Sequence, residues 1–155
     1  MIRTLIASLI TALCVPALAQ APAGADRLSD VLVAGEDWQV AVEGLGFADG
    51  LSYDGQGNVF FADLRGDGAG VYKLAPDGTK TKLYATGRSG TRLGPDGKLY
   101  ACGGKTLVAI NPADGKTTPV ADNLGTNDLA VSKHGHVYIT DTGKKQVTLV
   151  DPRTG

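Results

Sequence analysis

The chain has 155 residues, of which 15 are basic and 16 are acidic, so its formal net charge is −1 at neutral pH. No basic run stands out, which argues against nucleic acid or an anionic membrane surface as the partner. The sequence holds 22 glycines, and aromatic residues make up only 6% of it. This composition is typical of many tight turns between short strands.

The first 19 residues predict a secretory signal peptide. Arg3 precedes the apolar run Leu5–Val15, and Ala17–Ala19 places small residues around a cleavage site. The run is too short to span a membrane, and no second apolar stretch of that length follows. We therefore expect a periplasmic or secreted protein that has no membrane contact after cleavage. Residues 20–37 are expected to form a linker and an N-terminal segment.

Cysteine usage limits how the exported domain is stabilised. Once the signal peptide is removed, Cys102 is the only cysteine left. A single thiol cannot form an internal disulfide, so the hydrophobic core must hold the domain together. The position of Cys102 in a predicted strand indicates a small buried hydrophobe rather than a nucleophile.

The predicted elements begin with Trp38–Val42, whose alternating pattern favours a strand. Three similar segments follow, namely Asp49–Asp63, Ser89–Gly103 and Asn127–Asp141. Their turn glycines are Gly57, Gly97 and Gly135, which are 40 and then 38 residues apart. Self-similarity at such a period indicates an array of identical supersecondary units.

Each repeat shows the same order of strands and turns. First strands are expected at Gly50–Tyr53, Thr91–Leu93 and Leu129–Val131. Second strands are expected at Val59–Ala62, Leu99–Cys102 and Val137–Thr140, and third strands at Gly70–Leu74, Thr106–Ile110 and Gln146–Val150. A fourth strand is visible in two repeats, at Thr81–Tyr84 and Thr117–Ala121. Four short antiparallel strands in about 40 residues are typical of one blade of a β-propeller.

These elements predict an all-β fold, a β-propeller over residues 38–155 with blades near 47–86, 88–122 and 126–155. No segment between the strands has the length or the period of a crossover helix, which argues against a parallel α/β sheet. Propellers close with roughly four to eight blades, whereas this region holds about three four-stranded blades. The sequence therefore indicates an incomplete fragment, a truncated form of a larger propeller.

Three signatures in this order resemble the calcium-dependent lactonase family of gluconolactonase and regucalcin (senescence marker protein). They are Phe47–Asp63, Ser89–Tyr100, and Gly125–Val131 together with Tyr138–Thr142. The resemblance covers Trp38–Gly155, about three of that family's six blades. It implies hydrolysis of a small lactone or sugar-acid derivative at the central channel, with calcium as the expected ion and zinc, manganese or magnesium as alternatives.

The resemblance also implies roles for individual residues. Asp49 takes the place of a metal-ligating Glu and is expected to be a metal ligand, although its side chain is one methylene shorter. Asn127 corresponds to a segment that contacts substrate, and Ser89 occupies the same place in the second repeat, so both are expected to bind substrate. The catalytic residue is unknown, because the family's base is expected beyond residue 155.

A divalent ion in such a site polarises the lactone carbonyl and lowers the pKa of a bound water, whose proton a nearby carboxylate removes. The repeat itself places Asp49, Ser89 and Asn127 at equivalent points, where the first strand of each blade begins. Structural alternatives remain, because Asp49 can also cap a turn and Asn127 can form an Asx-turn. Purely structural roles are expected for Asp128, Asp63 and Asp141.

Two other interpretations fit the same sequence. One is a non-catalytic propeller that binds a protein or a glycan in the periplasm. The other is an inactive, poorly folded fragment with unpaired strand edges.

Overall fold

The computed structural model describes residues 33–154, and within them it contains eleven strands and no helix. The predicted signal peptide and residues 20–32 of the predicted linker lie outside the described residues. All eleven of these strands belong to one compact unit that spans residues 40–155. No helix in the described part of the chain is long and apolar enough to cross a membrane.

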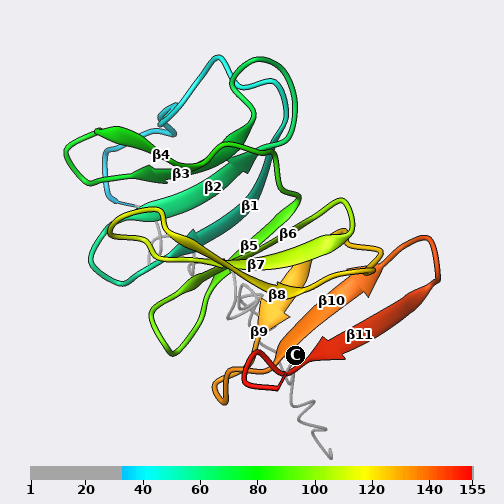
Figure 1. The fold of residues 1–155 in the computed structure, drawn as a ribbon. Coiled ribbons are helices and arrows are strands. Elements are labelled where there is room, and N and C mark those ends of the chain that lie inside the picture. Colours follow the sequence, from blue (N-terminus) through cyan, green and yellow to red (C-terminus); the bar gives the residue numbers. More distant parts are fainter. Residues whose placement is uncertain (1–32, 155) are drawn as a thin grey trace, which may run out of the picture. The chain divides into compact units, whose positions relative to one another are not determined.

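The strands form three antiparallel sheets that follow one another along the chain (Figure 1). Blade 1 contains β1 (Ala48–Tyr53), β2 (Val59–Asp63), β3 (Gly70–Leu74) and β4 (Lys80–Tyr84). Blade 2 contains β5 (Gly90–Leu93), β6 (Leu99–Gly103), β7 (Thr106–Ile110) and β8 (Thr117–Ala121). Blade 3 contains β9 (Leu129–Val131), β10 (Val137–Asp141) and β11 (Gln146–Val150). Within each blade, every strand pairs with the next one in sequence, as in a propeller blade, which confirms the predicted fold class.

The turn glycines explain why the first two strands of each blade form a hairpin. Gly57, Gly97 and Gly135 have φ values of 90°, 76° and 87°. Side chains with a Cβ rarely adopt this left-handed region, whereas glycine enters it without a steric penalty. The period of the repeat is therefore set by a backbone requirement that recurs at the same point of each blade.

Two predictions about the N-terminal strands need correction. Trp38–Val42 forms no strand, because none of the strands within residues 33–154 pairs with it, and the side chain of Trp38 is 85% exposed. The first strand of blade 1 also begins earlier than expected, at Ala48. Its pairing with β2 is irregular between Asp49 and Ser52, and Gly50 has a φ of 58°. Asp49 consequently lies within β1 rather than before it.

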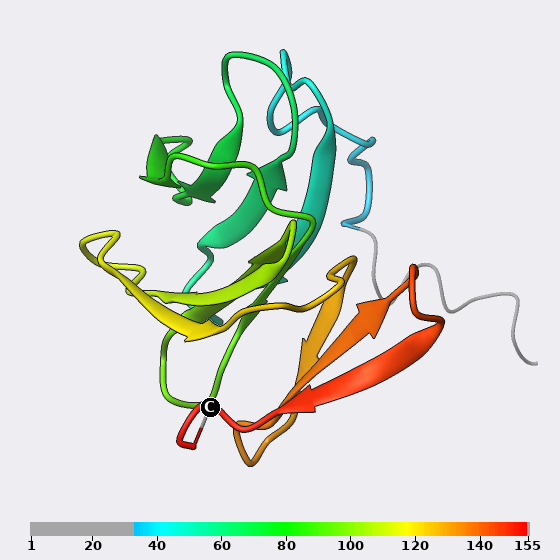
Figure 2. The ribbon, with the colours of Figure 1, turned by 45° about the vertical axis from the view of Figure 1, so that its right-hand side comes forward.

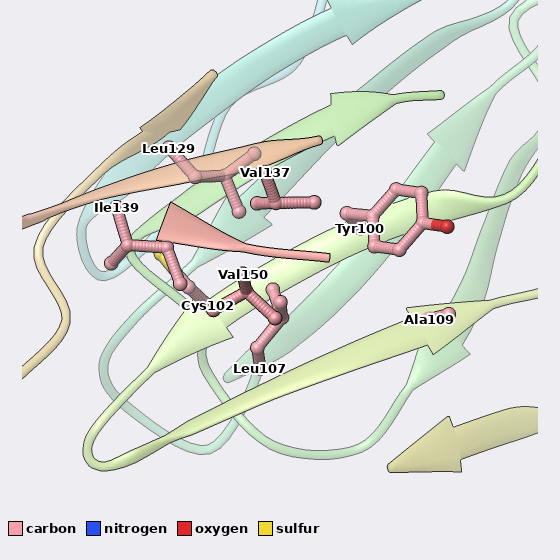
Figure 3. Packing of buried hydrophobic residues seen from close by; sticks show 8 residues of the cluster. All are labelled: Tyr100, Cys102, Leu107, Ala109, Leu129, Val137, Ile139 and Val150. Carbon is pink, nitrogen blue, oxygen red and sulfur yellow. The ribbon is translucent and has the colours of Figure 1, made fainter. Parts of the chain in front are cut away.

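The core consists of two apolar clusters, each between successive sheets. Between blades 1 and 2 the buried members are Phe60, Val71, Leu99, Ala101, Val108 and Ile110. Between blades 2 and 3 they are Tyr100, Cys102, Leu107, Ala109, Leu129, Val137, Ile139 and Val150 (Figure 3). Burial of each large apolar side chain contributes roughly 1.5–3 kcal/mol, so the blades stabilise one another rather than fold alone. Figure 2 shows the three sheets in succession.

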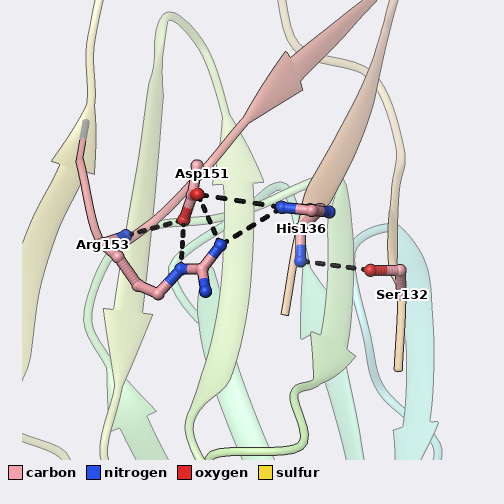
Figure 4. A network of polar contacts seen from close by, with 4 residues as sticks. All are labelled: Ser132, His136, Asp151 and Arg153. Atoms are coloured by element: carbon pink, nitrogen blue, oxygen red, sulfur yellow. Dashed lines mark hydrogen bonds and ion pairs between the residues drawn. The ribbon is translucent and has the colours of Figure 1, made fainter. Parts of the chain in front are cut away.

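A polar network links two turns of blade 3 (Figure 4). The Arg153 guanidinium donates to Asp151 through Nε (2.8 Å) and Nη2 (2.7 Å), and its backbone N–H also donates to that carboxylate. These bonds lower the pKa of Asp151 to about 2. The His136 ring lies 3.7 Å from Asp151, and its backbone N–H donates to the Ser132 hydroxyl. The network therefore ties the turn before β10 to the turn after β11.

Candidate functional site

The first strands of the three blades, β1, β5 and β9, lie next to one another. Glycines allow their backbones to come this close. A Cβ on Gly50 would lie 2.8 Å from the Thr91 nitrogen, and a Cβ on Gly90 would lie 3.0 Å from the Asp128 Cα. The first distance is shorter than real Cβ contacts and the second is tighter than nearly all of them, so a side chain at either position would force its neighbour to shift.

Side chains of β5 hold β1 in this arrangement. The Thr91 hydroxyl donates to the Gly50 carbonyl, and the Arg92 guanidinium donates to the Leu51 carbonyl. Thr91 is completely buried, so its hydroxyl needs a partner within the protein. The bonds join residues 41 positions apart, about one repeat, and they set the relative position of the two strand starts.

Asp49 lines a hollow of about 620 Å³. The side chain is exposed, and its Oδ1 accepts a hydrogen bond from the Gly50 N–H at 2.8 Å. Asp128 and Arg92 line the same hollow, which is otherwise mainly apolar. Two carboxylates and one guanidinium from three different blades therefore face one space.

Asn127 and Ser89, the two predicted substrate contacts, have different surroundings. Asn127 is exposed, and its backbone N–H donates to the Thr140 carbonyl at 2.9 Å, which leaves the amide side chain at the surface. Ser89 is buried, and its hydroxyl donates to the Cys102 carbonyl at 3.3 Å. Neither residue lines the hollow beside Asp49, so their roles in substrate binding stay predictions.

Asp128 and Arg92 also line the hollow, although the sequence analysis did not predict either of them as a site residue. Asp128 has the structural role expected of it, since its Oδ1 accepts from the Leu129 N–H at 2.8 Å and its carbonyl accepts from the Thr140 N–H. It also faces the hollow. Arg92 carries a charge at a position where the other two repeats have Ser52 and Ala130. This departure from the repeat is the feature of the sequence that could have marked Arg92 as a site residue.

The aspartate that ends the second strand of blade 1 has structural surroundings. Asp63 is buried, and it accepts hydrogen bonds from the backbone N–H groups of Phe47 (2.9 Å), Gly46 (3.1 Å) and Arg65 (3.3 Å). Burial alone would raise the pKa of Asp63, but these donors and the charge of Lys80 outweigh burial and lower it. The carboxylate thus holds the chain segment that leads into β1.

At the position equivalent to Asp63, blade 2 has Gly103, and the side chain of Arg88 lies against it. A Cβ on Gly103 would lie 2.9 Å from the Arg88 Cδ. Arg88 is only 6% exposed. Its guanidinium donates to the Gly103 carbonyl and the Thr106 hydroxyl, both at 2.8 Å, and to the Tyr84 hydroxyl of blade 1 at 2.7 Å. Arg88 therefore connects blades 1 and 2.

The expected divalent cation can be compared with these donors. Calcium takes roughly six to eight oxygen ligands. Within residues 33–154, no group of three or more His, Cys, Asp or Glu side chains converges on one point. Asp49 and Asp128 supply carboxylate oxygens, the ligand type that a hard cation prefers, at one hollow. The donors fit such an ion in kind but do not complete its ligand set.

Comparison with known families decides what kind of propeller this is. The family model for the SMP-30/gluconolactonase/LRE-like region matches residues 47–152. The chain belongs to this family. The match begins just before β1 and ends just after β11, so it includes all three blades and the charged residues of the hollow, Asp49, Arg92 and Asp128. No curated protein sequence matches the chain significantly.

Solved structures share the fold at low sequence identity. A protein assigned as a gluconolactonase in a structural genomics project is 21% identical, with a TM-score of 0.63 over 75% of this chain and 43% of its own. A gluconolactonase from Xanthomonas campestris is also 21% identical, with a TM-score of 0.60 over 72% of this chain and 46% of its own. A streptogramin B lyase is 18% identical, with a TM-score of 0.52 over 67% and 40%. The chain thus spans less than half the length of each structure.

Proposed function

We propose that this chain serves an exported, metal-dependent lactonase-like hydrolase that opens a small cyclic ester, a lactone of the sugar-acid type. Membership of the gluconolactonase-like family supports the general activity. One observation of the structure carries the location of the site. The close approach of β1, β5 and β9 places Asp49, Asp128 and Arg92 around a single hollow.

The metal is part of this proposal. A bound divalent ion, calcium in the first instance, supplies Lewis acidity toward the lactone carbonyl. Asp49 would be one of its ligands, and Asp128 offers a second carboxylate beside it. The remaining ligands and the general base would come from outside residues 33–154, in keeping with the length of the related structures.

The chain's own residues would bind and orient the substrate. The exposed amide of Asn127 can both donate and accept a hydrogen bond, which suits a hydroxyl of a sugar lactone. Ser89 would contribute only after its hydroxyl leaves the Cys102 carbonyl. Arg92 brings a fixed positive charge to the hollow, which would attract the carboxylate that ring opening produces.

Acid release from a panel of aldonolactones, with and without a chelator, tests the activity of a protein that contains this chain together with the further blades of the propeller. We expect hydrolysis that the chelator abolishes and that Ca²⁺ or another divalent ion restores. Asp49→Asn should lower kcat/KM by at least about tenfold, because the amide is a weaker metal ligand. Asp67→Asn is the matched control, since Asp67 is also exposed but does not line the hollow. Activity that survives chelation would refute metal dependence, and no hydrolysis of any lactone would favour the non-catalytic binding module.

Export has its own test. Expression of the complete chain in a Gram-negative host should yield a periplasmic or extracellular product whose mass corresponds to cleavage after Ala19. A cytoplasmic product of full mass would contradict export without affecting the lactonase test.

A further inference from the structure

A second hollow of about 620 Å³ is lined by residues of blades 1 and 2, and it shares no lining residue with the hollow beside Asp49. Its polar side chains are those of Tyr84 at the end of β4, Arg88 between β4 and β5, Thr106 at the start of β7, and Asp122 just after β8. Apolar residues of β7 and β8 line the rest. The proposed lactonase reaction does not use this hollow.

Blade 2 departs from the repeat beside this hollow. Blades 1 and 3 end their second strands with a buried aspartate, Asp63 or Asp141, whereas blade 2 has a glycine there. The position of Arg88 is taken by Ala48 in blade 1 and by Thr126 in blade 3. Where two blades bury a negative charge, blade 2 therefore buries a positive one.

The charge of Arg88 has no acidic partner within residues 33–154. The residue is 6% exposed, and none of the ion pairs in this part of the chain includes it. All three of its hydrogen-bond acceptors are neutral, namely the Gly103 carbonyl and the Thr106 hydroxyl for Nη1 and the Tyr84 hydroxyl for Nη2. Burial of a charge costs free energy unless the charge is paired, so a bound anion would stabilise this arginine.

Two side chains of the hollow still have hydrogens to donate. A guanidinium carries five N–H donors, and three of those of Arg88 are engaged, which leaves one on Nε and one on Nη2. Nε is shielded from solvent and has no acceptor among the described residues. The Tyr84 hydroxyl accepts from Arg88, so its own hydrogen is free as well. Paired N–H groups of one guanidinium are the donors that bind a carboxylate or a phosphate through two parallel bonds.

The other residues of the hollow favour a carboxylate over a phosphate. Asp122 is exposed and lines the hollow, and its negative charge repels a doubly charged phosphate more strongly than a singly charged carboxylate. Pro119 and Val120 offer apolar contacts, which suit the body of an organic molecule better than an inorganic ion.

We propose that this hollow binds a small organic carboxylate. The carboxylate oxygens accept hydrogen bonds from Nε and Nη2 of Arg88 and from the Tyr84 hydroxyl, while the apolar body of the ligand contacts Pro119 and Val120. Because Nε is shielded from solvent, binding requires a small rotation of the guanidinium toward the hollow. This inference concerns a second site, and it holds whether or not the chain hydrolyses lactones.

An NMR titration of the purified, ¹⁵N-labelled chain with benzoate at low ionic strength tests the site. We expect the Nε–H signal of Arg88 to move downfield and its exchange with water to become slower, because this hydrogen gains an acceptor. Benzamide has the same shape without the charge, and it should leave the signal unchanged. Inorganic phosphate should bind more weakly than benzoate, because Asp122 repels it more strongly.

Three variants separate the site from a purely structural role of Arg88. Arg88→Lys keeps the charge but loses the paired donors, so its affinity for benzoate should fall by at least about tenfold. Asp122→Asn removes a repulsion and should bind benzoate about two- to threefold more tightly. Asp67→Asn is the matched control and should bind as the wild type does, since Asp67 is exposed and lines neither hollow.

The titration of the wild type and the Asp122→Asn variant decide the question even if circular dichroism shows that Arg88→Lys does not fold. An Nε–H signal that ignores benzoate would overturn the proposal, and it is the result expected if Arg88 only links two blades. An equal response to benzamide would overturn it too, because the charge would then play no part. Tighter binding of phosphate than of benzoate would refute the assignment to a carboxylate.

Discussion

Gly90 offers the sharpest test of how the first strands meet. It is the first residue of β5, buried between blades 2 and 3. An added Cβ would lie 2.8 Å from the Asp128 Oδ1, 3.0 Å from the Asp128 Cα and 3.0 Å from the Cys102 Sγ. The φ of Gly90 does not lie in the left-handed region, so Gly90→Ala perturbs packing rather than the backbone conformation.

Two opposing effects decide the magnitude. Alanine reduces the entropy of the unfolded chain, which stabilises a compatible site by about 0.4–1 kcal/mol. Overpacking of a well-packed core costs about 1–3 kcal/mol. The overpacking cost should win here, because one of the crowded atoms is backbone and cannot rotate away. We expect Gly90→Ala to lower the free energy of unfolding by about 1–2 kcal/mol.

Urea unfolding followed by circular dichroism measures this loss. Gly143→Ala is the control, because its Cβ would meet only the Asp141 Oδ1, at an ordinary 3.5 Å. The control should be neutral or slightly stabilised. Cys102→Ala removes one of the crowding atoms, so the double variant should lose less stability than the sum of the two single variants. A Gly90→Ala protein as stable as the wild type would refute the close approach of β5 and β9.

The remaining predictions concern two buried groups. Because the folded-state pKa of Asp63 is lowered, its stabilising effect is complete above the unfolded pKa of about 3.9 and is lost as pH falls through the lower folded value. The difference in unfolding free energy between wild type and Asp63→Asn should therefore be constant from neutral pH to about pH 5 and shrink at lower pH. Urea midpoints measured across this pH range would show it. A difference that grows as the pH falls would contradict the hydrogen-bonded carboxylate. Burial raises the pKa of the Cys102 thiol to about 11, so a disulfide reagent at pH 8 should label Cys102 only after denaturation, and rapid labelling of the native protein would contradict its burial.

Much of the fold was predictable because its causes are local. Side chains of the second strands point alternately to the two sides of the blade. A glycine with positive φ ends the turn before each of these strands, as at Gly57 and Gly97. These features recur at a fixed period and need no knowledge of tertiary contacts. The prediction was wrong for Trp38–Val42, where alternation alone could not show that a pairing strand is missing. It also placed the start of β1 too late, since the irregular pairing around Gly50 leaves no simple pattern.

The candidate site was predictable only in part. The repeat placed Asp49 at the start of the first strand of its blade, and the structure shows it at the hollow. The repeat also predicted a substrate contact for Ser89, whose hydroxyl turns to the Cys102 carbonyl. Arg92 and Asp128 were not expected at the site. Their presence depends on which side of a strand faces a neighbouring blade, and this depends on the packing of three sheets.

By itself, the sequence determined the blades and their order, because alternation and turn glycines act over a few residues. Tertiary structure alone decided which residues from different repeats meet. Asp49, Arg92 and Asp128 are far apart in sequence and share one hollow only because glycines let the first strands come into backbone contact. The structure also decided that Tyr100 and Leu107 of blade 2 are buried while their counterparts Tyr138 and Val147 of blade 3 are exposed, because burial depends on a neighbouring sheet and not on the residue type alone.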